Sequence, residues 1–223
     1  MDINYSRQAN VFDKDEWNGR NIPIHIVGVG ATGSWLTLML AKMGITNITV
    51  WDFDTVEEHN LPNQLFDVHD VGMAKVFALQ NTVMQHTGFT INARDEKVTG
   101  ATRLNGIVFV LTDTMKSREY IFKALKYKIG VKQVIETRMS GEGGYIYTFN
   151  PIITKEIEAY EKTLYSDEEA EVSACGTSIS IISTAINIAS QAVWKFINYA
   201  NDKENSFFTA VGLQENVIYS EGA

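Results

Sequence analysis

The stretch Ile22-Pro-Ile-His-Ile-Val-Gly28-Val-Gly30-Ala31-Thr-Gly33 decides the fold class of this chain. Its first half is apolar enough for a buried strand, and residues 31–42 behind it carry apolar side chains at helical spacing. The glycines stand at the turn between the two. Gly28 would allow the tight turn, Gly30 would let the backbone approach a phosphate, and Gly33 would let helix and strand pack closely. The first amides of a helix bind anions, so the stretch predicts a nucleotide phosphate site.

Strands and helices alternate through the chain beyond this turn. Apolar or alternating segments predict strands, and segments of helical periodicity separate them. The predicted strands are residues 47–52, 90–98, 107–112, 131–137 and 144–149, and the last of these extends the strand at 131–137 or turns back from it. The predicted helices are residues 73–86 and 115–127. This order predicts an α/β fold with a Rossmann-like, doubly wound, mostly parallel sheet and flanking helices.

We expect a single domain over residues 1–223 rather than two domains. A polar arm (residues 1–20) precedes the alternating part, and a crossover (residues 151–176) with a short helix at 155–164 follows it. A long buried helix is predicted over residues 177–199. The tail (residues 205–223) is expected to add strands at 206–211 and 215–219.

Composition excludes several classes of protein. The net charge of −8 argues against nucleic-acid binding, which needs a clustered basic surface. Polar residues interrupt the longest apolar stretch, residues 179–197, so it indicates a buried helix and no membrane span. No signal-peptide pattern opens the chain, and we expect a cytoplasmic protein. Cys175 is the only cysteine, so neither an internal disulfide nor structural zinc is expected.

Polar residues placed after the predicted strands favour ATP. The glycine turn alone does not choose between NAD, FAD and ATP. Asp52, 19 residues after Gly33, can accept hydrogen bonds from a ribose. A lysine would neutralise phosphates and an acid would hold Mg²⁺. The candidate nucleotide-binding residues are Gly28, Gly30, Ala31, Gly33, Asp52, Asp54, Asn60, Asn63, Gln64, Lys75 and Asp113, and Asp113 is the candidate metal ligand.

In their order, six short motifs resemble the ThiF/MoeB family of ubiquitin-activating-type adenylyltransferases, in a short form. They are Tyr5-Ser-Arg-Gln8, residues 27–33, Val50-Trp-Asp-Phe-Asp-Thr-Val56, Asn60-Leu-Pro-Asn-Gln64, Gly72-Met-Ala-Lys75 and Thr112-Asp113. The resemblance implies ATP-dependent adenylation of the C-terminal carboxylate of a ubiquitin-like or sulfur-carrier protein ending in Gly-Gly. It also implies ribose contact by Asp52, nucleotide contacts by Asn60 and Lys75, and magnesium at Asp113. It implies a homodimer in which Arg7 reaches the partner's phosphates.

The chain departs from the family pattern at three places. Asn63 stands where the family usually has arginine, and Arg138 either replaces that charge or pairs with Glu136 or Glu142. The Cys-x-x-Cys motifs of zinc-binding relatives are absent, and so is a separate ubiquitin-fold or rhodanese-like domain. Cys175 precedes the long helix, where it is a candidate nucleophile for a thioester or a buried inert thiol.

Three other functions stay open. The first is a noncatalytic nucleotide-binding scaffold, which Asn63 suggests. The second is a NAD- or FAD-dependent oxidoreductase that shares only the phosphate loop. The third is adenylation of an amino acid or a peptide.

Overall fold

The computed structural model describes residues 3–166 and 180–223, and eight strands form its single sheet. The order across the sheet is β3-β2-β1-β4-β5-β6-β7-β8. In chain order the strands are β1 (Ile24–Val27), β2 (Ile48–Asp52), β3 (Asn92–Asp95), β4 (Gly106–Val110), β5 (Val131–Met139), β6 (Gly143–Phe149), β7 (Phe208–Gly212) and β8 (Val217–Glu221). The helices are α1 (Lys14–Gly19), α2 (Ala31–Lys42), η1 (Glu58–Asn60), α3 (Lys75–Thr87), α4 (Met115–Leu125), α5 (Thr154–Glu161) and α6 (Ile182–Ala200).

The sheet has a parallel half and an antiparallel half. Strands β1 to β5 pair in parallel, with Ile24 in register with Ile48 on one side and with Ile107 on the other. Strand β6 turns back on β5, and β7 and β8 continue antiparallel to the edge. The predicted α/β, mostly parallel, Rossmann-like architecture is confirmed. Residues 144–149 turn back from β5 and join the sheet as its antiparallel neighbour β6.

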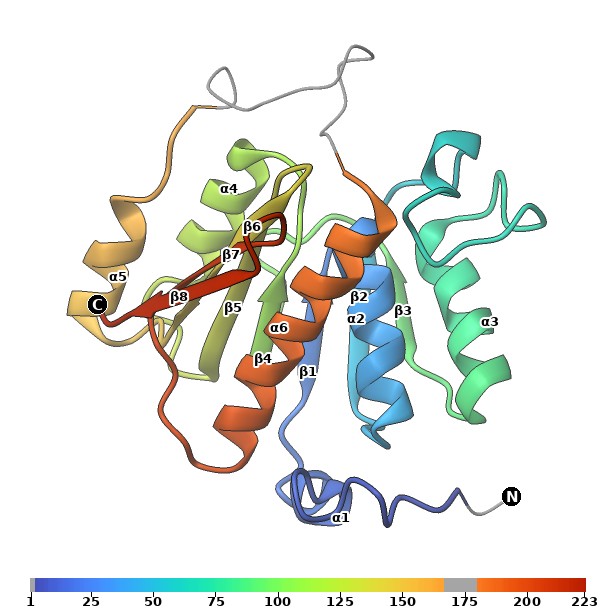
Figure 1. The fold of residues 1–223 in the computed structure, drawn as a ribbon, viewed down its shortest axis with the longest axis horizontal. Coiled ribbons are helices and arrows are strands. Elements are labelled where there is room, and N and C mark those ends of the chain that lie inside the picture. The colour runs from blue at the N-terminus through green and yellow to red at the C-terminus, as the bar shows by residue number, and fades with distance from the viewer. Residues whose placement is uncertain (1–2, 167–179) are drawn as a thin grey trace.

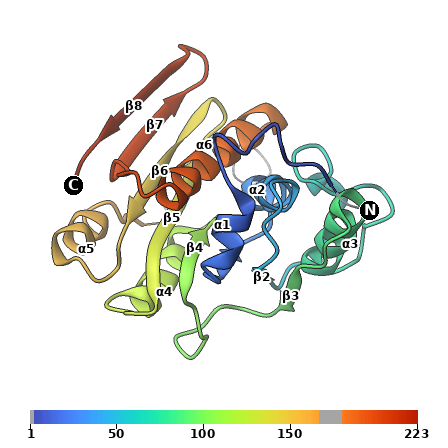
Figure 2. The same cartoon turned by 90° about the horizontal axis from the view of Figure 1, so that it is seen from below.

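Helices cover both faces of the sheet, as Figures 1 and 2 show. Helices α2, α3 and α6 lie on one face, and α4 and α5 lie on the other. The buried residues divide accordingly. Ile24 and Ile26 of β1 belong to the cluster with α2 and α6, whereas Val27 joins the cluster with α4 and α5. Because successive side chains of a strand point to opposite faces, strands buried on both sides are mostly apolar.

Helix α1 lies in the predicted polar arm, where no helix was expected. The Asp13 side chain caps it by accepting hydrogen bonds from the backbone N–H groups of Asp15 and Glu16. Trp17 is 2% exposed, and its ring meets Phe196 of α6 edge-on at 4.7 Å. Six residues alone do not make a stable helix, so packing on α6 stabilises an element that local periodicity does not reveal.

Several predicted boundaries were wrong by a few residues. Helix α6 begins at Ile182 instead of 177, because Ile181 is extended, and the start of the predicted span lies outside the described residues. Helix α3 begins at Lys75 because Ala74 forms a bridge with Thr55. Strand β3 covers only Asn92–Asp95. In the part of the chain that the structure describes, no helix is long and apolar enough to cross a membrane.

Candidate functional site

The glycine turn lies at the carboxyl ends of the parallel strands, between β1 and the first turn of α2 (Figure 1). Two of its glycines are needed for packing. Gly28 has φ +94°, and a Cβ there would lie 2.7 Å from the carbonyl oxygen of Leu111. A Cβ on Gly33 would lie 2.0 Å from the carbonyl oxygen of Gly28. Gly30 differs, because the nearest atom to its Cβ position is Gln64 Nε2 at 3.9 Å. The fold leaves room at Gly30, as a backbone that approaches a phosphate requires.

Asp52 ends β2 and is tied directly to this turn. Its Oδ2 accepts a hydrogen bond from the backbone N–H of Val29 at 2.8 Å, and its Oδ1 accepts one from Asp54 at 3.0 Å. Burial raises the pKa of the Asp52 carboxyl, while these two donors and nearby Lys75 act in the opposite direction. Each carboxylate oxygen keeps further acceptor capacity, so Asp52 can also accept from a ribose hydroxyl.

Lys75 is buried at the start of α3, close to the carboxyl end of β2. Its Nζ lies 3.1 Å from Oδ2 of Asp54, and its backbone N–H donates to the carbonyl of Asp54 at 2.9 Å. The Lys75 side chain is 9% exposed and the Asp54 side chain 50%. The ion pair therefore fixes the positive charge of Lys75 beside the end of β2, where it would stabilise bound phosphates.

The segment with Asn60, Asn63 and Gln64 lies against the first turn of α2. Asn60 is 5% exposed, and its side chain accepts from the backbone N–H of Glu57. Two residues of α2 secure the segment: Trp35 Nε1 donates to the Asn63 carbonyl at 3.1 Å, and Ser34 Oγ accepts from Leu65 N–H at 3.0 Å. Ser34 and Trp35 were not predicted as site residues, although both directly follow the last glycine of the motif.

Three buried polar atoms near the carboxyl ends of the parallel strands have no hydrogen-bond partner within the described residues: Asn63 Oδ1, Gln64 Oε1 and Thr112 Oγ1. A buried acceptor without a partner costs about 1–3 kcal/mol. Gln64 also lies beside Gly30. Unused hydrogen-bonding atoms beside the open backbone at Gly30 suit a nucleotide, because its ribose and base carry donors and acceptors.

Asp113 follows β4 by three residues, because the strand ends at Val110 and not at residue 112 as predicted, and its side chain is exposed. Arg118 of α4, which the sequence analysis did not single out, donates from Nη1 to the Asp113 carbonyl at 3.2 Å. Among residues 3–166 and 180–223 there is no group of three His, Cys, Asp or Glu side chains that could hold a metal ion. One exposed carboxylate suits Mg²⁺, which usually takes one or two carboxylates together with phosphates and water.

Arg138 pairs with Glu136 and does not stand in for the missing family arginine. Its Nε lies 3.1 Å from Glu136 Oε2, and its Nη1 and Nη2 donate to the carbonyl and hydroxyl of Thr163 at 2.6 and 2.9 Å. Its guanidinium lies 4.4 Å from the ring centre of Tyr147. Arg138 is 6% exposed, so its guanidinium is buried among these protein partners. At the position of the usual arginine, Asn63 Nδ2 instead donates to the hydroxyl of Ser180.

The N-terminal arm, to which Arg7 belongs, lies at the opposite end of the sheet from the glycine turn (Figure 1). Gln8 Nε2 donates to the carbonyl of Met43 at 2.7 Å, so the arm is attached where α2 ends. Twelve residues of α2 separate this point from the turn, a distance of about 18 Å at 1.5 Å per residue. The structure therefore does not bring exposed Arg7 together with the other candidate residues of its own chain.

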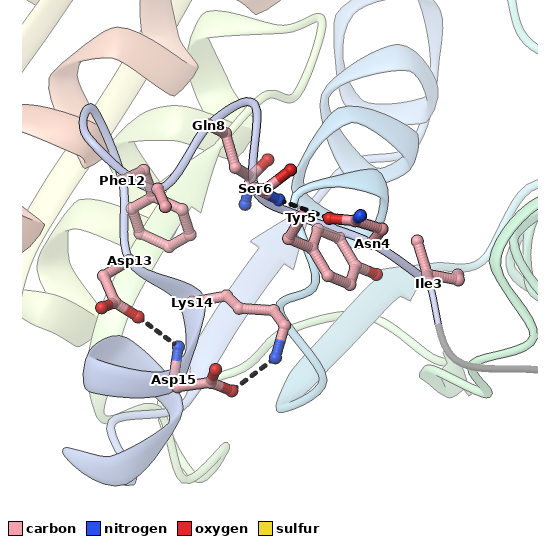
Figure 3. Close-up of a pocket in the computed structure, with 10 residues that line it drawn as sticks. Ile3, Asn4, Tyr5, Ser6, Gln8, Phe12, Asp13, Lys14 and Asp15 are labelled. Carbon is pink, nitrogen blue, oxygen red and sulfur yellow. Dashed lines mark hydrogen bonds and ion pairs between the residues drawn. The ribbon is translucent and has the colours of Figure 1, made fainter.

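Two hollows lie away from the candidate site. One, of about 360 Å³, lies under the arm, where Lys14 pairs with Asp15 and stands over the ring of Tyr5 (Figure 3). The other, of about 390 Å³, is lined by residues such as Lys132, Asn150 and Lys203. Neither is lined by the glycine turn. Cys175 lies outside the described residues.

Known proteins resemble this chain both in sequence and in fold. A family model described as "ThiF family" matches residues 5–218. Ubiquitin-like modifier-activating enzyme 5 of Gallus gallus is 37% identical over 70 residues, which are 31% of this chain and 18% of that protein. The same enzyme of Oryza sativa subsp. japonica is 39% identical over 64 residues, which are 29% of this chain and 15% of that protein. The matched region is thus less than a fifth of these relatives.

Solved structures match over almost the whole chain. The structure of E. coli MccB with MccA has a TM-score of 0.75 at 16% identity, covering 99% of this chain and 72% of that chain. E. coli MccB with ATP has a TM-score of 0.70 at 16% identity and covers 100% and 72%. PaaA has a TM-score of 0.73 at 16% identity and covers 98% and 72%. At this identity the likeness establishes the fold.

Proposed function

Because this chain belongs to the ThiF family, we propose that it is an ATP-dependent adenylyltransferase that activates a carboxylate of another protein. The observation that carries the proposal is the convergence of the glycine turn, Asp52, Lys75 and Asp113 on one edge of the sheet. A crystal structure of E. coli MccB with ATP, which shares the fold, supports ATP as the nucleotide.

Each group has a distinct role in this proposal. Asp52 accepts from the ribose, and the backbone at Gly30 approaches the phosphates. Lys75 neutralises phosphate charge from its position beside Asp54. Magnesium, held by Asp113 and phosphate oxygens, would neutralise the charge that accumulates on the departing pyrophosphate. Gln64 and Asn63 supply acceptors to the nucleotide from the segment beside α2.

The reaction is a displacement at the α-phosphorus of ATP. A carboxylate oxygen of the substrate forms a bond to this phosphorus, and the bond from the phosphorus to the bridging oxygen breaks. The electron pair leaves with pyrophosphate, so no proton transfer is required. The protein then contributes mainly position and charge stabilisation, which is what a lysine, a glycine turn and a metal-binding acid offer.

The substrate that we propose is the C-terminus of a ubiquitin-like or sulfur-carrier protein ending in Gly-Gly. Local similarity to ubiquitin-like modifier-activating enzyme 5 supports this class. The test is ATP–pyrophosphate exchange, measured with and without a candidate carrier and with the carrier lacking its last two residues. Exchange that requires the intact carrier supports the proposal. Exchange with free peptides or amino acids instead would assign the substrate to that class.

Two outcomes would replace the proposal with a rival function. Binding of MgATP without exchange for any carrier would favour a nucleotide-binding scaffold, for which Asn63 in contact with Ser180 is the structural argument. Thermal stabilisation by NAD and not by MgATP would favour an oxidoreductase.

We further propose a homodimer in which Arg7 completes the partner's site, because the arm lies a helix length from its own glycine turn. The test mixes two inactive variants, Arg7→Ala and Asp113→Ala. A mixed dimer carries both lesions at one site and neither at the other. Random reassortment should restore about a quarter of the wild-type rate. No recovery in mixtures shown to exchange subunits would contradict a role in trans.

A thioester at Cys175 is a separate proposal for the step after adenylation. The thiolate would displace AMP from the activated carboxyl carbon. A carrier adduct that thiols release in wild type and that is missing in Cys175→Ala supports this step. An adduct that persists in Cys175→Ala contradicts it.

A further inference from the structure

Glu136 has no exposed surface although it is a carboxylate. It lies on β5, between two arginines. Arg118 Nε approaches its Oε1 at 2.7 Å as an ion pair that is not aligned as a hydrogen bond, and Arg138 Nε approaches its Oε2 at 3.1 Å. Both arginines are less than 10% exposed. Burying ionised groups is unfavourable unless each is paired, and apolar residues would fill the same volume at less cost.

Arg118 uses its remaining donors on two other segments. Its Nη1 donates to the carbonyl of Asp113 and its Nη2 to the carbonyl of Thr137, each at 3.2 Å. One planar guanidinium thus connects the β4–α4 loop, the start of α4 and the end of β5. A lysine could keep the charge beside Glu136, but it could not hold three partners in this fixed fork.

The anchored residue is the one that the proposed function needs in a defined place. Asp113 lies in a short loop between β4 and Thr114, which caps α4. Its side chain is exposed and its backbone carbonyl is held from the protein side by Arg118. Fixing the backbone in this way limits where the carboxylate can lie, as a metal ligand requires.

We infer that Arg118, held in place by Glu136, is the positioning residue that fixes Asp113 for the metal-bound nucleotide. The metal part of this inference rests on the proposed function, whereas the anchoring of the loop does not. Arg138 supports the same carboxylate from the side of Thr163. Arg118 acts only through the loop and contacts neither the substrate nor the metal itself.

The experiment compares wild type with Arg118→Lys and with the control Lys195→Met. Lys195 is also a buried cation, but it belongs to α6 and donates to Ser206 at 2.7 Å. Amide hydrogen exchange is measured without ligand over residues 111–117. We expect at least tenfold faster exchange there in Arg118→Lys and no local change in Lys195→Met at matched overall stability. Unchanged exchange in Arg118→Lys would overturn the inference whatever the nucleotide does.

A second measurement separates positioning from the proposed function. ATP affinity is titrated with and without Mg²⁺ in both variants. Arg118→Lys should lose most of the Mg²⁺-dependent gain in affinity and keep the Mg²⁺-free affinity, whereas a merely structural role would lower both. Wild type that shows no Mg²⁺-dependent binding would overturn the proposed function and the metal role together, and the exchange result would still decide the anchoring.

If Arg118→Lys does not fold, Glu136→Gln replaces it, because it releases Arg118 without removing it. A double-mutant cycle with Asp113→Asn completes the test. In the Asp113→Asn background, Glu136→Gln should cause no additional loss of Mg²⁺-dependent affinity, since the two residues act as one unit. Additive losses would show independent effects and contradict the inference.

Discussion

Two polar clusters, one on the parallel strands and one in the loops beyond their carboxyl ends, differ in how their hydrogen bonds are used. At His25, Trp51 Nε1 donates to Nδ1 at 3.2 Å, so Nε2 carries the proton and donates to Asn105 Oδ1 at 3.1 Å. Both ring nitrogens therefore have protein partners. Near the carboxyl ends of the parallel strands, Gln64 Oε1 and Thr112 Oγ1 are buried and have no hydrogen-bond partner in the described part of the chain.

The difference separates a cluster whose hydrogen bonds are satisfied within the protein from a group with unused acceptors, which is the candidate nucleotide site. A buried polar group in a stable core normally has its partner within the protein. The His25 cluster follows that rule and joins β1, β2 and residue 105. The polar groups at the carboxyl ends of the parallel strands do not follow this rule. Loops meet at these strand ends, and ligands bind at this position in such folds. Perturbing each cluster should therefore affect a different property.

The largest effect is expected from Asp113→Ala at the carboxyl edge. Pyrophosphate exchange should fall about 10²- to 10³-fold, the usual loss when a group that stabilises transition-state charge is removed. Thermal stability should stay near that of wild type because the side chain is exposed. Glu119→Ala is the matched control, an exposed acid of α4 paired with Lys123. Equal rates in the two variants would remove Asp113 from the site.

An intermediate effect should distinguish the two glycines of the turn. Gly33→Ala forces a Cβ within 2.0 Å of the Gly28 carbonyl oxygen and should lower the free energy of unfolding by about 1–3 kcal/mol. Gly30→Ala meets no atom closer than 3.9 Å, so its melting temperature should be unchanged. Its ATP affinity should instead fall about tenfold or more. The measurements are melting curves and ATP titration, and loss of stability in both variants would contradict the comparison.

The smallest effect should come from His25 and concerns pH. Burial lowers the pKa of His25 below its ordinary value of 6.5. Below pH 6.5 the unfolded chain therefore binds more protons than the folded one, and stability is lost as the pH falls through the folded pKa. Stability measured by denaturant from pH 7 to pH 5 should decline less in His25→Gln than in wild type. The same slope in both would show that His25 does not titrate in this range.

The sequence predicted much of the fold because its signals are local. Strand–turn–helix order, glycine spacing and apolar runs are readable within a few residues, and the predicted β1, α2, β2 and β4 agree with the structure to within about two residues. The prediction missed α1 because Trp17 gains its stability from Phe196, 179 positions away in the chain. It placed the start of the long helix before Ile182 because apolar periodicity continues through Ile181, whose backbone is extended.

The sequence proposed which residues could form the candidate site, but it did not predict how they contact one another. Motif order selected Asp52, Lys75 and Asp113 as candidates. Asp52 and Asp113 follow neighbouring parallel strands, whose carboxyl ends lie together, and Lys75 joins them through its ion pair with Asp54. The sequence left two choices open for Arg138, and the contacts with Glu136 and Thr163 decide for pairing. Arg118 carried no signal as a lone arginine in an amphipathic helix.

The glycine turn and the acid at the end of β2 were thus determined by the sequence itself, because each depends on backbone conformations and spacings within one β–α–β unit. The tertiary structure decided which charges remain available to a ligand. It buried Arg138 beside Glu136, placed Asn63 against Ser180 and left Arg7 at the far end of α2. Charge pairing depends on distances between segments far apart in the chain, and those distances exist only once the sheet has formed.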